Sequence, residues 1–285
     1  MWISDRWKDY ALIDCSDGER LERWGDKLFI RPDPQVIWQT ARTHPGWQVY
    51  ENRYVRSSSG GGSWERNVKS ARWPLSYGAL NFRVGPMNFK HMGLFPEQAV
   101  NWLWLQEKIK THGKKPFNVL NLFAYTGGAT VACLKAGAHV THIDAAKGMN
   151  RTAKDNITLS GLDHIPNRVL ADDVLKFVQR EARRGNQYHG IIMDPPVFGR
   201  GPSGEMWKLE EKLYELAKAC TKIFDPDPAF LLINAYTAGF SPAAYGNILK
   251  LVMPNVGVIT THEIGLAAKS GVILPCGMYA RWENT

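Results

Sequence analysis

A rigid acidic turn follows one of the most apolar segments of the chain. Residues 190–193 read Gly-Ile-Ile-Met and lead directly into Asp194-Pro195-Pro196. Each proline fixes its own φ and lacks an N–H group, so the turn holds its carbonyls and the Asp194 carboxylate in set directions. Such a turn can hold a flat group, and it can equally be a plain proline-rich end of a strand. Taken alone, the segment leaves both interpretations open.

A glycine pair marks a second candidate site. Gly127-Gly128 follows the apolar run 117–123 and opens a segment with helical spacing. Glycines let the backbone pass close to a ligand, at the crevice where doubly wound folds bind nucleotides. The loop does not match G-x-G-x-x-G, and the chain has no G-x-x-x-x-G-K-[ST] segment, which disfavours a dinucleotide site and a phosphate-binding loop. The loop could also be only the start of a helix.

Two more acids occupy the ends of expected strands. Asp144 comes seventeen residues after Gly127, where an acid can accept hydrogen bonds from both hydroxyls of a ribose, or can cap the next helix. Further on, Asp172-Asp173-Val174 offers an acid for an adenine amino group and an N–H for a ring nitrogen. Each feature is weak alone. The ordered set of glycine loop, acid, acid and Asp-Pro-Pro at successive strand ends is a strong indication of a nucleoside-binding site.

The elements that would position these residues alternate along the chain. This alternation predicts a doubly wound parallel sheet, because helices between strands cover both of its faces. A final pair of segments, 256–266 and 277–284, predicts a hairpin at the edge of the sheet. The expected strands are 117–123, 139–144, 167–171, 190–194 and 229–235, and the expected helices are 97–113, 127–137, 147–160, 173–185 and 205–224.

The first ninety or so residues predict a small β-rich unit with a basic and aromatic surface. The chain has a net charge of +8, and eight basic residues but only two acids lie from Arg42 to Lys90, interleaved with aromatic residues. Basic residues bind phosphates and aromatic rings stack on unpaired bases, so an RNA partner is expected before a membrane. The candidate RNA-binding residues are Arg53, Arg56, Arg66, Lys69 and Arg72.

Composition excludes several other classes. No apolar run reaches the roughly 18 residues of a membrane span, and the first residues do not form a signal peptide. The four cysteines, Cys15, Cys133, Cys220 and Cys276, have no C-x-x-C spacing, which argues against a zinc site or a disulfide framework. We therefore expect a cytoplasmic protein without a metal.

The complete set of motifs resembles the class I S-adenosylmethionine (SAM) methyltransferases, and more closely the bacterial 23S rRNA large-subunit methyltransferase family, which includes 5-methylcytosine and 7-methylguanine enzymes. The resemblance covers about residues 80–285 and rests on FKHMGLFPEQ, NLFAYTGGAT, ADDVLKF and MDPPVFGR. It implies a Rossmann-like α/β fold with a small β-rich RNA-binding domain at 1–90 and a methyltransferase domain at 91–285. It also implies SAM as cofactor and 23S rRNA or a large-subunit precursor as partner; a monomer and a homodimer both remain open.

The resemblance also assigns roles to individual residues. The 125–127 loop would wrap the methionine end of SAM, Asp144 would hold the ribose and Asp173 the adenine amino group. This chain departs from the family at Asn121, where many members have an acid, and at the FPEQ run, which replaces an aspartate and an arginine. The residues expected to bind SAM are Lys90, Phe95, Gln98, Asn121, Phe123, Tyr125, Thr126, Gly127, Gly128, Asp144, Asp172, Asp173, Val174 and Asp194.

The methylated atom follows from the nucleophiles that are present. Methylation of cytosine C5 needs a thiolate, and in the family members that do this a cysteine follows the fifth strand. Residues 233–237 contain none, and Cys276 is the one plausible substitute. Guanine N7 has its own lone pair, so it is the expected target; guanine N2, cytosine C5 and a non-catalytic RNA-binding protein with a vestigial SAM fold are the alternatives. The expected catalytic residues are Asp194, Pro195, Pro196, Phe198 and Arg200, with Arg200 binding a phosphate or a guanine edge, or else simply solvated.

Overall fold

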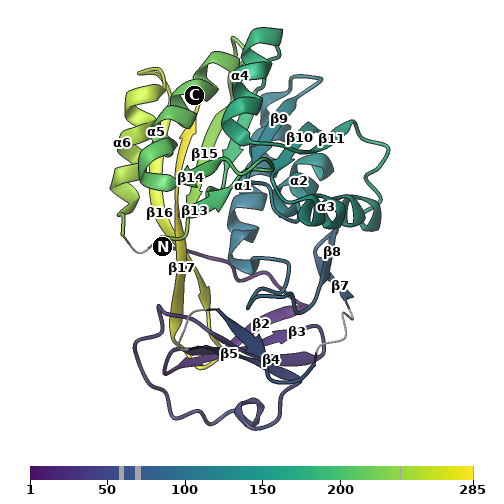
Figure 1. The fold of residues 1–285 in the computed structure, drawn as a ribbon, viewed down its shortest axis with the longest axis vertical. Helices are drawn as coiled ribbons and strands as arrows, with labels where there is room; N and C mark the ends of the chain where they lie inside the picture. The colour runs from purple at the N-terminus through teal and green to yellow at the C-terminus, as the bar shows by residue number, and fades with distance from the viewer. Residues whose placement is uncertain (58–60, 68–71, 238, 285) are drawn as a thin grey trace. The chain divides into compact units, whose positions relative to one another are not determined.

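The computed structural model describes residues 1–57, 61–67, 72–237 and 239–284, and the chain divides into two compact units (Figure 1). The first unit comprises Met1–Val100 and Ile264–Cys276, and the second comprises Asn101–Glu263 and Gly277–Thr285. The first compact unit thus extends to Val100, ten residues beyond the boundary expected from the sequence. A stretch near the C-terminus, 264–276, also joins the first unit, which differs from the expected division into two continuous segments.

The first unit is β-rich, as the sequence predicts. The first three strands of its main sheet form an antiparallel meander, connected by tight turns with positive φ at Asp17 and Gly18 and at Gly25, and the fourth strand of this sheet pairs in parallel with the third. Ile13, Leu21 and Ile30 form a small apolar core. The strands are β1 (Trp2–Ile3), β2 (Tyr10–Ser16), β3 (Glu19–Trp24), β4 (Lys27–Pro32), β5 (Asn52–Arg56), β6 (Gly62–Trp64), β7 (Trp73–Tyr77) and β8 (Leu80–Val84), and the short 3-10 helices are η1 (Pro45–Trp47) and η2 (Pro96–Gln98).

A buried ionic cluster stabilises this small unit. The Glu22 carboxylate is fully buried and accepts hydrogen bonds from Arg31 Nε at 2.6 Å, Arg31 Nη2 at 2.8 Å and the Tyr10 hydroxyl at 2.8 Å. Burial alone would raise the pKa of Glu22, but the charges of Arg20 and Arg31 outweigh it and lower this pKa to about 2. Glu22 therefore remains ionised in the folded protein far below the pH at which an exposed glutamate takes up a proton.

The Glu22 carboxylate should make the stability of the fold depend on pH. Its pKa is lower in the folded chain than the ordinary value of 4.5, so its stabilising contribution is complete above pH 4.5 and is lost as the pH falls toward 2. This pKa shift corresponds to about 3 kcal/mol in the free energy of unfolding. We expect Glu22→Gln to lower the free energy of unfolding at pH 7 and to flatten its decline at acidic pH, measured by urea denaturation at each pH. The exposed Glu51→Gln should keep the wild-type pH profile; an unchanged acid decline in Glu22→Gln would contradict the prediction.

The second unit is built on the predicted doubly wound sheet. Its strands are arranged β16-β17-β15-β12-β9-β10-β11; β9 pairs in parallel with both β10 and β12, and the order of strands reverses beside β9. Ligands bind outside the carboxyl ends of the strands at such a reversal. The strands are β9 (Asn118–Leu122), β10 (His139–Asp144), β11 (Asn167–Ala171), β12 (Gly190–Met193), β15 (Phe230–Ala235), β16 (Val258–Ala267) and β17 (Ile273–Glu283), and β17 pairs antiparallel with β15.

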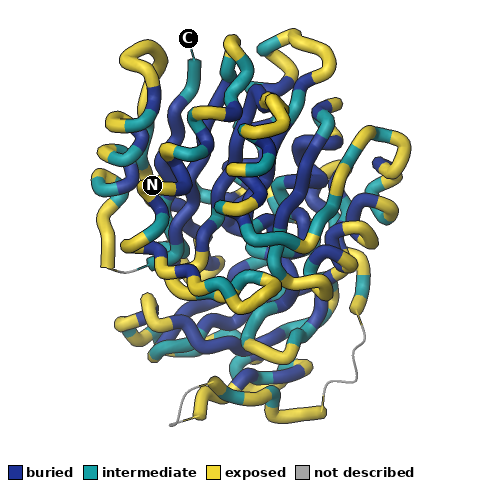
Figure 2. Tube along the Cα trace, turned by 45° about the horizontal axis from the view of Figure 1, so that its top comes forward, coloured by how far each residue is buried: buried dark blue, intermediate teal, exposed yellow. Residues whose placement is uncertain are grey.

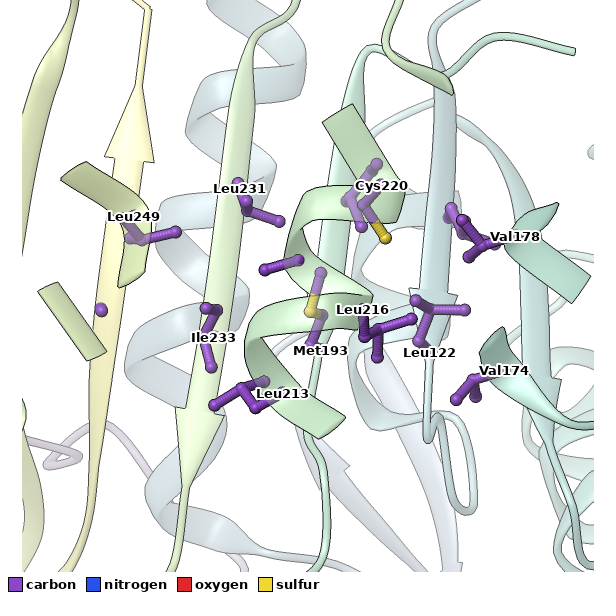
Figure 3. Packing of buried hydrophobic residues seen from close by; sticks show 14 of the residues in the cluster. Leu122, Val174, Val178, Met193, Leu213, Leu216, Cys220, Leu231, Ile233 and Leu249 are labelled. Atoms are coloured by element: carbon purple, nitrogen blue, oxygen red, sulfur yellow. The ribbon is translucent and has the colours of Figure 1, made fainter. Parts of the chain in front are cut away.

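Helices cover both faces of this sheet, because side chains alternate between the faces along each strand. Leu231 and Ile233 of β15 pack with α4, α5 and α6 in the main apolar cluster, and Figure 3 shows Leu213 and Leu216 of α5 directed at the strands. On the other face, Phe230 contacts Trp104 of α1. The helices are α1 (Ala99–His112), α2 (Gly128–Lys135), α3 (Lys147–Leu159), α4 (Val174–Arg184), α5 (Leu209–Cys220), α6 (Pro242–Val252) and the short η3 (Thr221–Ile223).

The prediction of a helix over 205–224 is wrong for its first residues. Residues 206–208 form a strand, β14 (Met206–Lys208), which pairs with β13 (Phe198–Arg200) in a small antiparallel hairpin, and α5 begins only at Leu209. Met206 and Lys208 are exposed whereas Trp207 is buried, which is the period of a strand. The central strands β9, β12 and β15 are almost entirely buried, whereas half of the residues of β16 are exposed. Figure 2 shows the exposed residues mainly along the connecting segments and the outer sides of the helices. Within the described ranges, no helix has both the length and the apolar character to cross a bilayer.

Candidate active site

The loop between β9 and α2 has an unusual backbone. Phe123 and Tyr125 have φ of 55° and 51°, and Gly127 has φ of 84°. The left-handed region is costly for aromatic residues, so surrounding contacts must hold this conformation. Inside the turn, the N–H of Ala124 donates to the Ile143 carbonyl at 3.0 Å. Backbone strain concentrated at one strand end is typical of a ligand-binding loop.

Buried polar side chains support this loop from beneath. The Asn156 amide on α3 donates to the Thr126 carbonyl at 2.8 Å. Asn121 donates to the Thr130 hydroxyl at 2.9 Å, and this hydroxyl lies 2.9 Å from His142 Nδ1. Burial lowers the pKa of His142 to about 4, so the ring is neutral at neutral pH. The Asn121 side chain is thus bound inside the unit by α2, and sequence reasoning missed the supporting residue Asn156.

The glycine pair has structural as well as binding reasons to be glycine. A Cβ on Gly128 would lie 2.8 Å from Trp102 Cζ2, closer than carbon atoms pack. Gly127 has a left-handed φ, and a Cβ there would lie 3.1 Å from that of Ala153. Gly127 is also the N-cap of α2. The close packing of α2 on its neighbours therefore depends on both residues.

Asp144 lies at the end of β10, beside the glycine loop. Its Oδ2 accepts the N–H of Tyr125 at 2.9 Å, and its Oδ1 accepts the N–H of Ala146 at 2.8 Å. Burial raises the pKa of Asp144, and the two backbone hydrogen bonds lower it only in part. The N-cap of α3 is Ala146, so Asp144 does not itself cap that helix. Each carboxylate oxygen retains a second lone pair, and the pair of oxygens can therefore still accept two hydroxyl groups.

The two acids after β11 have different environments. Asp173 is the N-cap of α4, where its Oδ1 accepts the N–H of Lys176 at 2.9 Å. Asp172 pairs with Arg180 and accepts the N–H of Asp173 at 2.9 Å. Val174, the third residue of this predicted group, is buried. Asp173 keeps its Oδ2 for a ligand, whereas the charge of Asp172 is already compensated.

The Asp194-Pro195-Pro196 turn follows β12 and is locked to its neighbours. The N–H of Asp194 points to the Leu122 carbonyl of β9 at 3.3 Å, which joins the turn to the start of the glycine loop. Pro195 is buried and Pro196 exposed. The Pro196 carbonyl accepts the indole N–H of Trp207 at 2.7 Å. Sequence reasoning missed Trp207, and the signal that could have found it is a lone aromatic in the polar stretch 201–208.

The small hairpin has two different faces. Trp207 and Gly199 pair across the hairpin on its inner side, and Trp207 is only 6% exposed. On the outer side Phe198 faces Lys208 and Arg200 faces Met206, and all four are exposed. The outer face therefore presents an aromatic ring, a thioether and two cations directly after the acidic turn.

Other predicted residues lie in the first unit. These include Lys90, Phe95 and Gln98; burial and the charge of Arg20 lower the pKa of Lys90 to about 8. Arg53 bonds to Glu19 at 2.7 Å, and Arg66 donates to the Tyr50 and Glu51 carbonyls.

Three candidate RNA-binding residues remain. Arg56 and Arg72 are exposed, and Lys69 lies outside the described residues. In the part of the chain that the structure describes, no three His, Cys, Asp or Glu side chains gather as a metal site.

Comparison with known proteins agrees with this geometry. The profile of the S-adenosylmethionine-dependent methyltransferases matches residues 31–219, and a crystal structure of the SAM-dependent methyltransferase from Agrobacterium tumefaciens is 35% identical with a TM-score of 0.94. That alignment covers 100% of this chain and 93% of the other. This chain belongs to the SAM-dependent methyltransferase family. The predicted family, fold class and cofactor are thereby confirmed.

Curated members of the family are larger. The ribosomal RNA large subunit methyltransferase I of Aeromonas hydrophila is 37% identical over 68% of this chain and 47% of its own length. The ribosomal RNA large subunit methyltransferase K/L of Shewanella frigidimarina is 31% identical over 55% of this chain and 21% of its own length. The chain thus spans about half or less of these relatives. The crystal structure of SMU.776 complexed with SAH is 15% identical at a TM-score of 0.75 and shares the fold.

The strand-end residues of this methyltransferase fit SAM. Asp144 can still accept two hydroxyl groups, Gly127 has no side chain to block the approach of a ligand, and Asp173 uses only its Oδ1 in the cap of α4. These groups follow β10, β9 and β11, which are neighbours in the sheet. Acceptors of the kind that an adenosine moiety needs therefore lie on adjacent strand ends.

Proposed function

We propose that this chain is a SAM-dependent methyltransferase that methylates a base of 23S rRNA, guanine at N7. The relatives named above are ribosomal RNA large subunit methyltransferases, which supports an rRNA substrate. The acidic turn after β12 supports a planar target, since its carboxylate and proline-fixed carbonyls have set directions. SAM supplies an electrophilic methyl group, and the protein needs only to align a nucleophile with it.

The single observation that favours a nitrogen as the methylated atom is that the cysteine thiols remain protonated. Burial raises the pKa of each cysteine, Cys15, Cys133, Cys220 and Cys276, well above its ordinary value. Methylation at a cytosine carbon requires a thiolate that adds to the ring, and a thiol in an apolar environment is inert. Cys276 lies in β17 with its sulfur 3.5 Å from the Leu274 carbonyl. A guanine nitrogen, which has its own lone pair, therefore suits this chain better than cytosine C5.

In the proposed mechanism the protein binds, orients and stabilises charge. Asp144 and Asp173 hold the adenosine part of the cofactor, and the loop 123–127 encloses its methionine part. Asp194 accepts hydrogen bonds from the guanine edge and, as the base gains a methyl group and a positive charge, stabilises that charge. No general base is needed, because N7 carries no proton. Phe198 stacks on the base or its neighbour, and Arg200 binds a phosphate.

The proposed RNA contacts extend to the first unit. Arg56 and Arg72 are exposed there, whereas Arg53 and Arg66 use part of their donors within the unit. A guanidinium has five N–H donors, so these two can still bind phosphates. We propose that Arg56 contributes most to RNA affinity, and Arg72 and Lys69 remain candidates from the sequence.

The test of this function is a nucleoside analysis. Unmodified 23S rRNA is incubated with the protein and isotope-labelled SAM, digested, and examined by mass spectrometry. Labelled 7-methylguanosine supports the proposal. Labelled N2-methylguanosine or 5-methylcytidine would overturn the choice of atom, and absence of label in RNA would overturn the substrate.

Substitution of Cys276 tests whether the methylated atom is a nitrogen or a carbon. We expect Cys276→Ser to retain kcat within about twofold of the wild type, since the half-buried thiol takes no part in the proposed reaction. The measurement is the initial rate of label transfer to RNA at saturating SAM. The control is Cys220→Ser, which replaces a fully buried thiol and reports the cost of a hydroxyl in an apolar environment. Loss of transfer in Cys276→Ser alone would favour cytosine C5.

A further inference from the structure

Trp207 contacts two loops that must act together. Its indole N–H donates to the Pro196 carbonyl of the acidic turn at 2.7 Å. Its ring lies against Phe123 of the glycine loop, with 4.7 Å between the ring centroids and an angle of 60° between the planes. Both loops follow neighbouring parallel strands, β9 and β12. A single rigid side chain therefore spans from the cofactor side of the site to its substrate side.

The hairpin holds this indole firmly. Trp207 pairs with Gly199 in the β13–β14 ladder, and the N–H of Leu209 donates to the Val197 carbonyl at 3.0 Å. At the far end of the hairpin the Gly201 N–H donates to the Glu205 carbonyl at 2.8 Å. The Glu205 carboxylate accepts Lys176 Nζ of α4 at 2.6 Å. The ring is therefore fixed by backbone pairing at both ends of the hairpin as well as by its own contacts.

The contact between Trp207 and Phe123 matters because of the backbone conformation of Phe123. Phe123 has a φ of 55°, so the glycine loop holds an aromatic residue in a costly conformation. The Trp207 ring contacts the Phe123 ring at a tilted angle, and such ring pairs are favourable contacts. The strained conformation of the loop and the direction of the Asp194 turn are thus tied to one residue.

We propose that Trp207 is a positioning residue that fixes the glycine loop and the Asp194 turn relative to each other; this rests on the proposed methyl transfer to a base. Methyl transfer requires the donor and the acceptor to approach in line, and small misplacements of a reacting group lower the rate strongly. The effect of losing Trp207 should therefore fall on kcat, with little change in the binding of either substrate.

Two substitutions separate the two contacts. Trp207→Phe keeps a ring beside Phe123 and removes the N–H bond, and we expect kcat to fall about tenfold. Trp207→Leu removes both contacts, and we expect a fall of about 100-fold. For both variants, the Kd of SAM by calorimetry and the KM of RNA should stay within about threefold of the wild type.

Trp282→Phe is the matched control. Trp282 is buried in the same apolar cluster, and its indole N–H also donates to a backbone carbonyl, that of Val256, at 2.9 Å. We expect it to lower the Tm as much as Trp207→Phe does while leaving kcat within about twofold. An equal fall in kcat for the two variants would overturn the proposal, as would a Trp207→Phe defect that lies entirely in the Kd of SAM.

Amide hydrogen exchange tests the same inference without any RNA. In Trp207→Leu, which removes both contacts, segments 122–126 and 194–199 should both exchange faster, whereas Trp282→Leu should leave both unchanged. Exchange that rises in neither segment, or in one alone, would overturn the positioning role. If the wild type transfers no methyl group to RNA, the proposed function fails, and the exchange result still decides whether Trp207 joins the two loops.

Discussion

Asp194→Ala is expected to lower kcat for methyl transfer by about 10²- to 10³-fold, while the Kd of SAM stays within about threefold. Asp194 lies directly after β12, partly buried, in a turn that two prolines stiffen. In the proposed reaction, positive charge develops on the guanine as N7 accepts the methyl group. A fixed carboxylate in a site of low dielectric stabilises that charge without having to reorient. The rate is measured by label transfer at saturating SAM, and the Kd by calorimetry.

Asp194→Asn distinguishes charge from orientation in the same assay. The asparagine retains an acceptor oxygen in the same turn but lacks the negative charge. An intermediate kcat, between those of the wild type and Asp194→Ala, is expected if both orientation and charge contribute. An Asp194→Ala rate within about threefold of the wild type would remove Asp194 from the mechanism.

The sheet and its strand-end acids could be predicted because their signals are local. Buried parallel strands are short apolar runs in the sequence, and each run is followed by polar residues at the edge where ligands bind. The strand expected at 139–144 is observed as His139–Asp144, and the one expected at 167–171 as Asn167–Ala171. The place of Asp144 at the end of the second strand of the sheet therefore follows from the sequence alone.

The contacts that stabilise the site could not be predicted, because they join residues far apart in the sequence. The Asn156 bond to Thr126 spans thirty positions, and the Trp207 ring reaches Phe123 from another strand end. The β13–β14 hairpin is hidden in the sequence because residues 205–208 directly precede a true helix and resemble its first turn. Local periodicity does not reveal such tertiary pairing.

The division into units escapes prediction for a similar reason. The N–H groups of Lys269 and Ser270 donate to the Leu12 and Ile13 carbonyls of β2 at 3.1 Å each. These bonds make 264–276 part of the first unit, although the segment is about 250 residues away along the chain. Likewise, the partial use of Arg53 by Glu19 depends on the pairing of strands and not on composition. Only the folded structure shows which basic side chains remain available to bind an RNA.

Asp144→Ala is expected to weaken SAM binding by about 100-fold or more. The variant loses the carboxylate proposed to accept two ribose hydroxyls, and hydrogen bonds to a charged group contribute about 1.5 to 3 kcal/mol each. Two such bonds amount to about 3 kcal/mol or more, which is roughly 100-fold in Kd. The same carboxylate accepts the N–H of Tyr125, so the substitution also releases the strained loop. Calorimetric titration with SAM measures the effect directly.

Asp144→Asn and Asp155→Ala complete this experiment. Asp155 is an exposed acid on the neighbouring helix α3, and its removal should leave the Kd within about twofold, which controls for the change in net charge. Asp144→Asn keeps one acceptor oxygen and donates through its NH₂ group, so it can serve either Tyr125 or a hydroxyl but not the full set. Its Kd should lie between those of the wild type and Asp144→Ala. If Asp144→Ala binds SAM within about threefold of the wild type, the carboxylate only supports the loop and the ribose is held elsewhere.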